Sequence, residues 1–516
     1  KQIRDVMEPI ARMDGDSLPV SAFVANANGE WEQGASAYEK RGTAVNVPEW
    51  DASKCVGCNQ CAFVCSHATI RPFQLTADEL AAAPAQTKSR DNKPANEYKF
   101  VMAVSPLDCM GCGECVTVCP TKAITMVPQD SQADQQAVFD YCVAEVSEKK
   151  DMQDNTVKGS QFMQPMLEFS GSCAGCAETS YARLVTQLFG DHMMISNATG
   201  CSSIWGGTAS ISPYTVNKDS GHGPAWCNSL FEDNAEQGLG LYIGQKTIRE
   251  NLIKEIAEVA GSDKASAELK AAFEKFLETK NNTKANDEPA KALIAELEKA
   301  AAAGCEKSAE ILKSKQYIAK KSVWIFGGDG WAYDIGFGGL DHVLASGKDV
   351  NVMVFDTEVY SNTGGQSSKS TPAGAIAKFA ASGKKIRKKD LGMMAISYGY
   401  VYVAQVAMGA SPAQYLNAIK EAEAYDGPSL IIAYAPCINH GLKAGMGLSQ
   451  KEEKLAVDCG YWHLYRYNPT LEAEGKNPFT LDSKEPDWTK FQDFLKGEVR
   501  FASLYKLFPD LSLIHI

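Results

Sequence analysis

Short apolar runs alternate with helical patterns over most of residues 161–510. Three of these runs are bounded by turn residues and predict buried central strands, at 322–326, 350–355 and 429–434. Before the last strand, the spacing predicts a helix over 412–424, which Ser411 can cap and which ends before Gly427 and Pro428. Strands that alternate with helices predict a doubly wound α/β domain with a parallel sheet.

Residues 251–314 have a different texture, rich in Lys, Glu and Ala. Glu296 and Lys299 lie one helical turn apart. Pro289 suits a helix start and Gly304 suits a helix stop. We predict a helical insertion on the surface of the α/β domain, and a solvated helical pair is favoured over a protein-binding role.

Two cysteine runs share the spacing C-x-x-C-x-x-C-x-x-x-C, within KCVGCNQCAFVC at 54–65 and DCMGCGECVTVCP at 108–120. This spacing is typical of bacterial ferredoxins with two [4Fe–4S] clusters, in which the fourth cysteine of each run ligates the other run's cluster. A zinc site or a disulfide framework is the alternative, which two matched runs of four disfavour. The crossed pattern predicts two ligand sets: Cys55, Cys58, Cys61 and Cys119 for one cluster, and Cys109, Cys112, Cys115 and Cys65 for the other.

The cysteine runs divide the first part of the chain. Residues 1–50, with many Gly, Asn and Pro, are expected to be a connector from an earlier region. Residues 51–128 are expected to form the α+β ferredoxin-like domain. Its insertion at 71–107 is predicted to cover a cluster or to contact the neighbouring domain. Residues 129–160 are expected to be a linker with a short helix around 137–147.

Composition narrows the class of protein. The 516 residues include 51 Lys and Arg against 63 Asp and Glu, a net charge of −12, which disfavours nucleic-acid and anionic-membrane partners. No apolar run approaches the length of a membrane span. Eight of the 16 cysteines lie in the two runs, so they are interpreted as metal thiolates in a reducing, cytoplasmic setting. A chain that opens on Lys1 without a signal peptide suggests a fragment, and its end, LSLIHI at 511–516, resembles a translated sequencing adapter.

Polar turns follow two of the predicted strands. Gly328-Asp329-Gly330 follows the first, and DTEVYSN at 356–362 follows the second. Both turns then lie at the carboxyl edge of a parallel sheet, where ligands bind. Glycines let a diphosphate approach the backbone, and an Asp oxygen suits Mg²⁺. The pair resembles the site of thiamine-diphosphate enzymes, with Thr357 where most of them have Asn; two ordinary strand-end turns are the alternative.

Four further cysteines stand outside the two runs. Cys173 and Cys176 lie in GSCAGCAET, Cys201 lies in NATGCSSIWGG, and Cys437 lies in YAPCINHG. Spacing alone leaves a redox motif, a metal half-site and chance open for the C-x-x-C pair.

Taken together, these strings resemble the carboxyl-terminal portion of the pyruvate:ferredoxin (flavodoxin) oxidoreductase family. The likeness also includes VSPLDCMGCGECVTVCP, GPAWCNSLFEDNAE, GGDGWAYDIGFGGLDH and DTEVYSNTGGQSSKSTP, and it spans about 19–469. The resemblance implies a third [4Fe–4S] cluster beside thiamine diphosphate, held by Cys173, Cys176, Cys201 and Cys437.

The resemblance also implies the cofactor contacts. Mg²⁺ would bind Asp329, Thr357 and the Val359 carbonyl, and Asn362 would also touch the substrate. Glu178 and Asn362 would be the catalytic residues supplied by this chain. The residues implied to contact thiamine diphosphate are Glu178, Cys201, Gly328, Asp329, Gly330, Trp331, Thr357, Glu358, Val359, Tyr360, Ser361 and Asn362.

The implied activity is oxidative decarboxylation of pyruvate with coenzyme A to acetyl-CoA and CO2, with electrons passing through three clusters to ferredoxin or flavodoxin. Relatives form homodimers. Their coenzyme A domain and main substrate residues lie in an amino-terminal half absent from this sequence, so this chain alone is expected to bind clusters without oxidising pyruvate. The alternatives are a different 2-oxoacid substrate, a pure electron-transfer module, and a non-redox thiamine decarboxylase with idle clusters, which the doubled cysteine runs disfavour.

Overall fold

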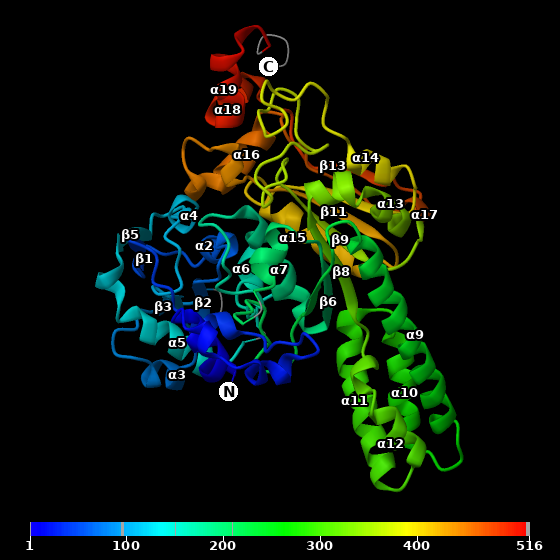
Figure 1. Ribbon diagram of the computed structural model, residues 1–516. Helices are drawn as coiled ribbons and strands as arrows, with labels where there is room; N and C mark the ends of the chain where they lie inside the picture. Colours follow the sequence, from blue (N-terminus) through cyan, green and yellow to red (C-terminus); the bar gives the residue numbers. More distant parts are fainter. Residues whose placement is uncertain (1, 94–96, 150, 209, 512–516) are drawn as a thin grey trace.

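The computed structural model describes residues 2–93, 97–149, 151–208 and 210–511 (Figure 1). Short helical segments, among them α1 (Glu8–Ala11), precede strand β1 (Asn46–Trp50). Of the tail at 511–516, where adapter-derived residues are expected, only Leu511 lies within the described residues.

The two cysteine runs lie between a pair of strands. β1 pairs antiparallel with β5 (Ile124–Pro128), with Trp50 opposite Ile124. α2 (Gln60–Val64) and α4 (Glu114–Thr117) lie inside the two runs. The ferredoxin-like unit begins before the boundary expected at 51. β1 belongs to it, because β1 pairs with β5 and buries Val47 and Trp50.

The segment between the runs forms an ordered sheet, and its Met102 lines the cavity of the first cysteine group. Its strands are antiparallel in the order β2-β4-β3. The following helix, α5 (Gln135–Glu145), packs Val138 and Phe139 against Val101 and Ala103, so the expected linker contributes to this core. The remaining elements of this region are β2 (Ile70–Leu75), α3 (Ala77–Ala82), β3 (Arg90–Asp91), β4 (Lys99–Val104) and α6 (Val157–Ser160).

An eight-stranded sheet organises the rest of the chain, in the order β13-β12-β10-β11-β9-β8-β6-β7. The six strands from β10 to β7 are parallel, and β12 and β13 add an antiparallel edge. The three predicted strands are confirmed as the neighbours β8, β9 and β11 at the centre. The bounds are β6 (Met193–Asn197), β7 (Ala225–Asn228), β8 (Ser322–Gly328), β9 (Asn351–Asp356), β10 (Tyr402–Val406), β11 (Ser429–Tyr434), β12 (Tyr465–Tyr467) and β13 (Phe479–Leu481).

Helices cover both faces of this sheet because successive side chains of a strand point to opposite faces. Trp324 and Phe326 of β8 pack on one face with α7 and α15, whereas Val323 and Ile325 pack on the other with α13 and α16. The predicted helix at 412–424 is confirmed, with Ser411 Oγ accepting from Gln414 N–H at 3.3 Å. The helices are α7 (Ala177–Phe189), α8 (Cys201–Gly206), α13 (Phe337–Ala345), α14 (Leu391–Ile396), α15 (Pro412–Ala424), α16 (Ser449–Asp458), α17 (Thr470–Ala473), α18 (Phe491–Gly497) and α19 (Val499–Leu507).

A buried acid on α15 gives a test of this packing. Ser322 Oγ (2.6 Å) and Trp324 Nε1 (3.0 Å) donate to Glu423, and burial raises the pKa of Glu423 from 4.5 to about 7. Because the carboxyl pKa is 4.5 in the unfolded chain and about 7 in the fold, stability is lost as the pH rises from about 4.5 to about 7, and the loss is complete above 7. The free energy of unfolding of Glu423→Gln, relative to that of the original protein, should therefore increase by about 3 kcal/mol from pH 5 to pH 8.

Thermal unfolding of both proteins at the two pH values measures this gain. Glu421→Gln is the matched control, because Glu421 is partly exposed and pairs with Arg466. An equal advantage of Glu423→Gln at both pH values would contradict the expected burial of a charged carboxylate.

Four helices project from the sheet as a bundle with its own apolar core (Figure 1). α9 starts at Asn234 and its first half packs on the sheet through Ala235, whereas the separate core of the bundle begins at Leu252, close to the predicted 251. Pro289 does not start a helix: α11 begins at Thr283, where the Asn282 side chain accepts from Ala285 N–H at 2.8 Å, and Pro289 lies inside it. The bundle consists of α9 (Asn234–Ala260), α10 (Ala267–Thr279), α11 (Thr283–Ala302) and α12 (Glu306–Leu312).

Among the residues that the structure describes, no helix combines the length and the apolar character that a membrane crossing requires.

Candidate cofactor site

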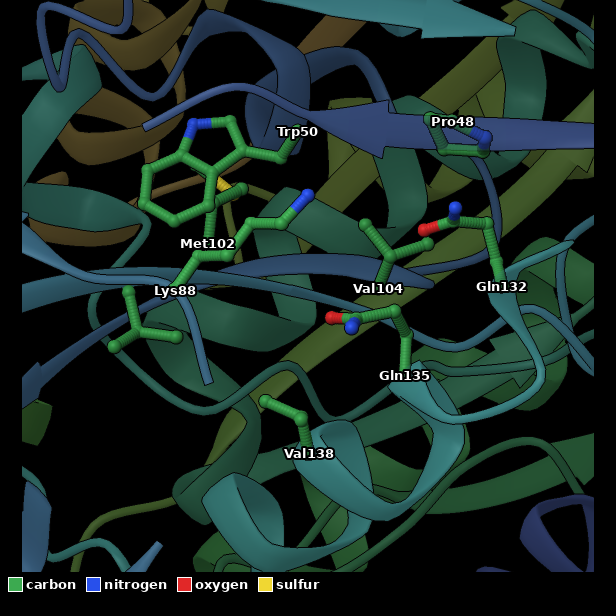
Figure 2. A pocket seen from close by; sticks show the side chains of 9 residues that line it. Pro48, Trp50, Lys88, Met102, Val104, Gln132, Gln135 and Val138 are labelled. Atoms are coloured by element: carbon green, nitrogen blue, oxygen red, sulfur yellow. The ribbon is translucent and has the colours of Figure 1, made fainter. Parts of the chain in front are cut away.

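The first cysteine group lines a cavity beside β1 and β5. Its walls include Trp50 and Met102 together with the thiols of Cys55, Cys58, Cys61 and Cys119. Burial raises the pKa of Cys58, and the nearby thiols of Cys55 and Cys119 raise it further. The fourth cysteine of the second run therefore lies with the first run. Figure 2 shows the neighbouring pocket, which shares Trp50 and Met102 but has no cysteine among its lining residues Pro48, Trp50, Lys88, Val101, Met102, Val104, Gln132, Gln135 and Val138.

The second group combines three cysteines of the second run with Cys65, the fourth cysteine of the first run. Burial, followed by the nearby thiol of Cys65, raises the pKa of Cys112 to about 12. Burial raises the pKa of Cys115 well above its usual range, with further contributions from Cys112, Cys61, Cys65 and Cys109. The structure thus brings Cys65 to the second run, as the crossed pattern predicts, and places the two groups next to each other.

Backbone amides point at the sulfur atoms in both groups. Gly57 N–H donates to Cys55 Sγ at 3.3 Å, and Gly111 N–H donates to Cys109 Sγ at 3.3 Å. Both glycines have left-handed backbones, with φ of +67° and +69°, which glycine adopts without strain. Such N–H donors stabilise thiolates and tune the potential of an iron–sulfur cluster.

The cysteines of both runs are free thiols, so none of them is tied up in a disulfide. Four thiolates are the ligand set of a [4Fe–4S] cluster, and each of the two groups supplies four.

The third cysteine group lies at the carboxyl edge of the large sheet. Cys173 and Cys176 precede α7, Cys201 begins α8, and Cys437 follows β11. Burial raises the pKa of Cys437 to about 12, with Glu178 and Cys173 adding to the shift. Burial also raises the pKa of Cys201, with contributions from Glu178, Cys437 and Cys176. The four thiols therefore form one neighbourhood, together with a carboxyl group.

Three oxygen groups converge at the ends of β8 and β9. Thr357 Oγ1 lies 2.9 Å from Asp329 Oδ1 and 3.0 Å from the Val359 carbonyl oxygen. Burial, followed by the Asp356 carboxylate, raises the pKa of Asp329 to about 8. A buried carboxyl group beside a hydroxyl and a carbonyl is a set of oxygens that suits Mg²⁺, which binds oxygen and keeps room for water and phosphate. The Asp356 carboxylate is not part of this set, because it pairs with Lys388 at 2.7 Å. The residues present therefore fit a magnesium diphosphate.

The loop after β9 joins this oxygen set to the third cysteine group. Cys201 Sγ lies 3.1 Å from Ser361 Oγ. Asn439 Nδ2 donates to the Ser361 carbonyl at 3.2 Å and to Cys437 Sγ at 3.6 Å. Ser361 of the predicted thiamine loop thus lies next to Cys201 and is linked to Cys437 through Asn439.

Glu178 lies in the first turn of α7 and is 5% exposed. Trp205 Nε1 donates to its carboxylate at 3.0 Å, and burial raises the pKa of Glu178 to about 7. A carboxyl group that holds or releases a proton near neutral pH suits contact with a cofactor.

The glycines of the predicted loop have distinct surroundings. A side chain on Gly330 would meet the Tyr360 ring at 2.4 Å, whereas the Cβ position of Gly328 is open apart from a carbonyl oxygen at 3.9 Å. Trp331 is fully buried in the core, so its contact with a cofactor would come from the backbone. Asn362, the implied substrate contact, is exposed.

The Glu358 side chain turns away into a buried charge cluster. Lys388 Nζ donates to it at 2.9 Å, Arg500 pairs with it at 2.8 Å, and Tyr461 OH donates to it at 2.5 Å. Its φ is +58°, a left-handed conformation in the loop that carries Thr357 and Val359. The charge cluster holds this loop in place, and only the backbone of Glu358 is left to face a cofactor.

Sequence reasoning missed several residues around this site. Ser368 Oγ donates to Asp329 Oδ2 at 2.6 Å, and His440 Nε2 lies 2.6 Å from the Thr357 carbonyl. Ser368 lies in the SSKST string and His440 in YAPCINHG, so the resemblance contained both residues, but no periodicity singled them out. Asn439, Lys388 and Arg500 also contact the site. They were missed because they lie in a short turn, in a loop and in α19, which carry no regular pattern pointing to the site.

Family models match three parts of the chain. A 4Fe-4S dicluster domain matches residues 54–123, and the C-terminal TPP binding domain of thiamine pyrophosphate enzymes matches 297–433. A domain of unknown function matches 1–44, where a connector was expected.

Relatives match nearly all of the chain. Pyruvate-flavodoxin oxidoreductase from Klebsiella pneumoniae is 57% identical over 515 residues, which cover 99% of this chain and 43% of the relative. Pyruvate:ferredoxin oxidoreductase from Moorella thermoacetica is 55% identical over 517 residues, covering 98% of this chain and 44% of the relative. Mitochondrial pyruvate dehydrogenase [NADP(+)] from Euglena gracilis is 46% identical over 513 residues, covering 98% and 28%.

The chain therefore spans less than half the length of these relatives. With its ferredoxin-like cysteine region, its thiamine-type α/β sheet and identities above one half over nearly its whole length, the chain is a close homologue of part of the pyruvate-flavodoxin and pyruvate:ferredoxin oxidoreductases.

Proposed function

We propose that the protein carrying this chain oxidises pyruvate with coenzyme A to acetyl-CoA and CO2, and passes the electrons through three [4Fe–4S] clusters to ferredoxin or flavodoxin. The observation that carries the proposal is the contact between Ser361, in the loop beside the oxygen set, and Cys201 of the third cysteine group. This contact supports a proposal in which the 2-oxoacid is decarboxylated directly beside the cluster that accepts its electrons. The names of the relatives support pyruvate as substrate and ferredoxin or flavodoxin as acceptor.

The chain's own residues have separate tasks in this proposal. Asp329, Thr357 and the Val359 carbonyl hold Mg²⁺ and through it the diphosphate, and Glu178 holds a proton near the cofactor. Bound thiamine diphosphate supplies an electron sink for decarboxylation of a 2-oxoacid. Asn362 contacts the substrate from the exposed side of the loop. The cluster ligands are Cys55, Cys58, Cys61 and Cys119; Cys109, Cys112, Cys115 and Cys65; and Cys173, Cys176, Cys201 and Cys437.

The proposal extends to organisation and setting. The second half of α9 and the helices α10–α12 form a helical insertion in the thiamine-binding domain, since their apolar core, which begins at Leu252, is separate from both faces of the sheet. Thiolates that bind clusters need a reducing compartment, which favours the cytoplasm. A homodimer and a coenzyme A site outside this chain follow from the family resemblance.

The complete protein, purified without oxygen, tests the function directly. Pyruvate and coenzyme A together should reduce ferredoxin or flavodoxin and form acetyl-CoA, and omission of coenzyme A should stop acetyl-CoA formation. Another 2-oxoacid used in preference to pyruvate would contradict the proposed substrate. Cluster-loaded protein without thiamine diphosphate and without turnover would instead support a pure electron-transfer module.

A further inference from the structure

One short segment separates two of the cysteine loops. Residues 445–450 lead into α16 and contain the helical turn Met446–Leu448. This turn contacts α4, which carries Cys115, and α16 lies beside α4 in Figure 1. The other side of the same segment faces the loop at 173–176.

The contact with the second ferredoxin-like group leaves no free space. A side chain on Gly447 would lie 2.1 Å from the carbonyl oxygen of Cys112. Ser449 Oγ lies 2.7 Å from Glu114 Oε1, and Gln450 N–H donates to the same oxygen at 3.2 Å. Glu114 is 2% exposed, so these donors replace the water that its carboxylate has lost.

The contact with the third group is equally close. A side chain on Gly175, between Cys173 and Cys176, would lie 2.3 Å from the carbonyl oxygen of Met446. Ser449 Oγ also lies 3.0 Å from the Gly175 carbonyl oxygen. Met446 and Gly447 are consecutive, so the two cysteine loops are held apart by the thickness of one polypeptide chain.

We propose that residues 446–450 form the bridge through which the third cysteine group and the group of Cys65, Cys109, Cys112 and Cys115 exchange electrons. Gly447 and Ser449 are its positioning residues. Gly447 allows the closest approach to Cys112, and Ser449 links the loop of Cys173 and Cys176 to Glu114. The inference rests on the proposed function, in which both groups hold [4Fe–4S] clusters and pyruvate supplies the electrons.

The step itself is a one-electron transfer. The cluster of the third group is oxidised by one electron and the cluster of the second group is reduced by one, without a change in the thiolate ligands. The spin coupling between two clusters weakens as the distance between them increases. An alanine at 447 adds a methyl group that can fit only if the Cys112 loop moves away.

The test uses the complete protein, purified without oxygen, with iron content and the EPR spectrum of the dithionite-reduced state as readouts. The original protein should show spin coupling between clusters as splitting of the reduced-cluster signals. Gly447→Ala should keep its iron and weaken the part of this splitting that arises between the third cluster and the cluster of the second group, whereas the splitting between the two ferredoxin-like clusters should remain. Gly244→Ala is the matched control, because that α9 glycine has no atom within 4 Å of its Cβ position, and it should keep both iron and splitting.

Ser449→Ala provides a second variant that only removes atoms, and it should weaken the splitting with iron retained. If Gly447→Ala loses iron, the Ser449→Ala variant serves as the test of the bridge. Unchanged splitting in a fully iron-loaded Ser449→Ala protein would overturn the bridge. If the original protein holds only two clusters, the proposed function fails, and with it the inference.

Discussion

Replacing Cys119 with serine disrupts the cluster of the first cysteine run, and the cluster of Cys119's own run remains. The structure places Cys119 in the cavity of Cys55, Cys58 and Cys61. Iron content should fall by one to about four of about twelve atoms, because the cluster of the first run loses one of its four thiolate ligands.

Double variants identify which cluster is lost. Cys119→Ser with Cys55→Ser should lose no more iron than either single change, whereas Cys119→Ser with Cys115→Ser should lose two clusters. Additivity is expected only for changes in separate clusters. Cys305→Ser, in the helical bundle, is the control and should keep all iron. The opposite pairing, in which the Cys119 and Cys115 changes remove one cluster together, would show that ligation is not crossed.

Asp329→Asn in the complete protein should weaken retention of thiamine diphosphate with Mg²⁺ by about 100-fold or more. Asparagine keeps the shape of the side chain but removes the charge beside Thr357 and the Val359 carbonyl. The cofactor-free protein should stay folded, because the change also removes a buried carboxylate that lies near Asp356. Titration calorimetry with Mg²⁺ and thiamine diphosphate measures the loss.

Asp349→Asn is the matched control for this prediction. Asp349 pairs with Lys320 at 2.8 Å at the opposite end of β9, so its change should leave cofactor binding intact. Equal cofactor affinity of Asp329→Asn and the original protein would remove the metal role from Asp329.

The fold was predictable where the strands are continuous apolar runs. β8, β9 and β11 are buried on both faces, so their composition alone marks them as central strands. β12 escaped prediction because it has three residues and carries Arg466, whose charge is paired with Asp482 and Glu421 only in the folded chain. β6 carries the buried polar residue Ser196, whose Oγ donates to Asn234 Oδ1 at the start of α9, far away in the sequence.

The position of Pro289 was misjudged for a related reason. Proline suits the first turn of an isolated helix, but α11 begins earlier with an Asn282 cap and is held by its buried face in the bundle. Tertiary packing there outweighs the loss of one backbone hydrogen bond.

The candidate site divides in the same way. That the turns of Asp329 and Thr357 lie together could be predicted from residues alone, because the ends of parallel strands meet at one edge of the sheet. The role of Thr357 in a magnesium site needed the resemblance to thiamine-diphosphate enzymes. The grouping of Cys173 and Cys176 with Cys201 and Cys437 needed the family resemblance. Ser368 and Arg500 could not be found from local pattern, since one lies in an irregular loop and the other on α19.

The central claim is that carbon chemistry at the Asp329 edge delivers electrons to the adjacent cysteine groups. An EPR spectrum of the complete, anaerobically purified protein, recorded after pyruvate is added without any other reductant, tests it most directly. The account predicts signals of reduced [4Fe–4S] clusters in the original protein and their absence in Asp329→Asn, with dithionite still able to reduce both. Clusters that dithionite reduces but pyruvate leaves oxidised in the thiamine-loaded original protein would contradict it.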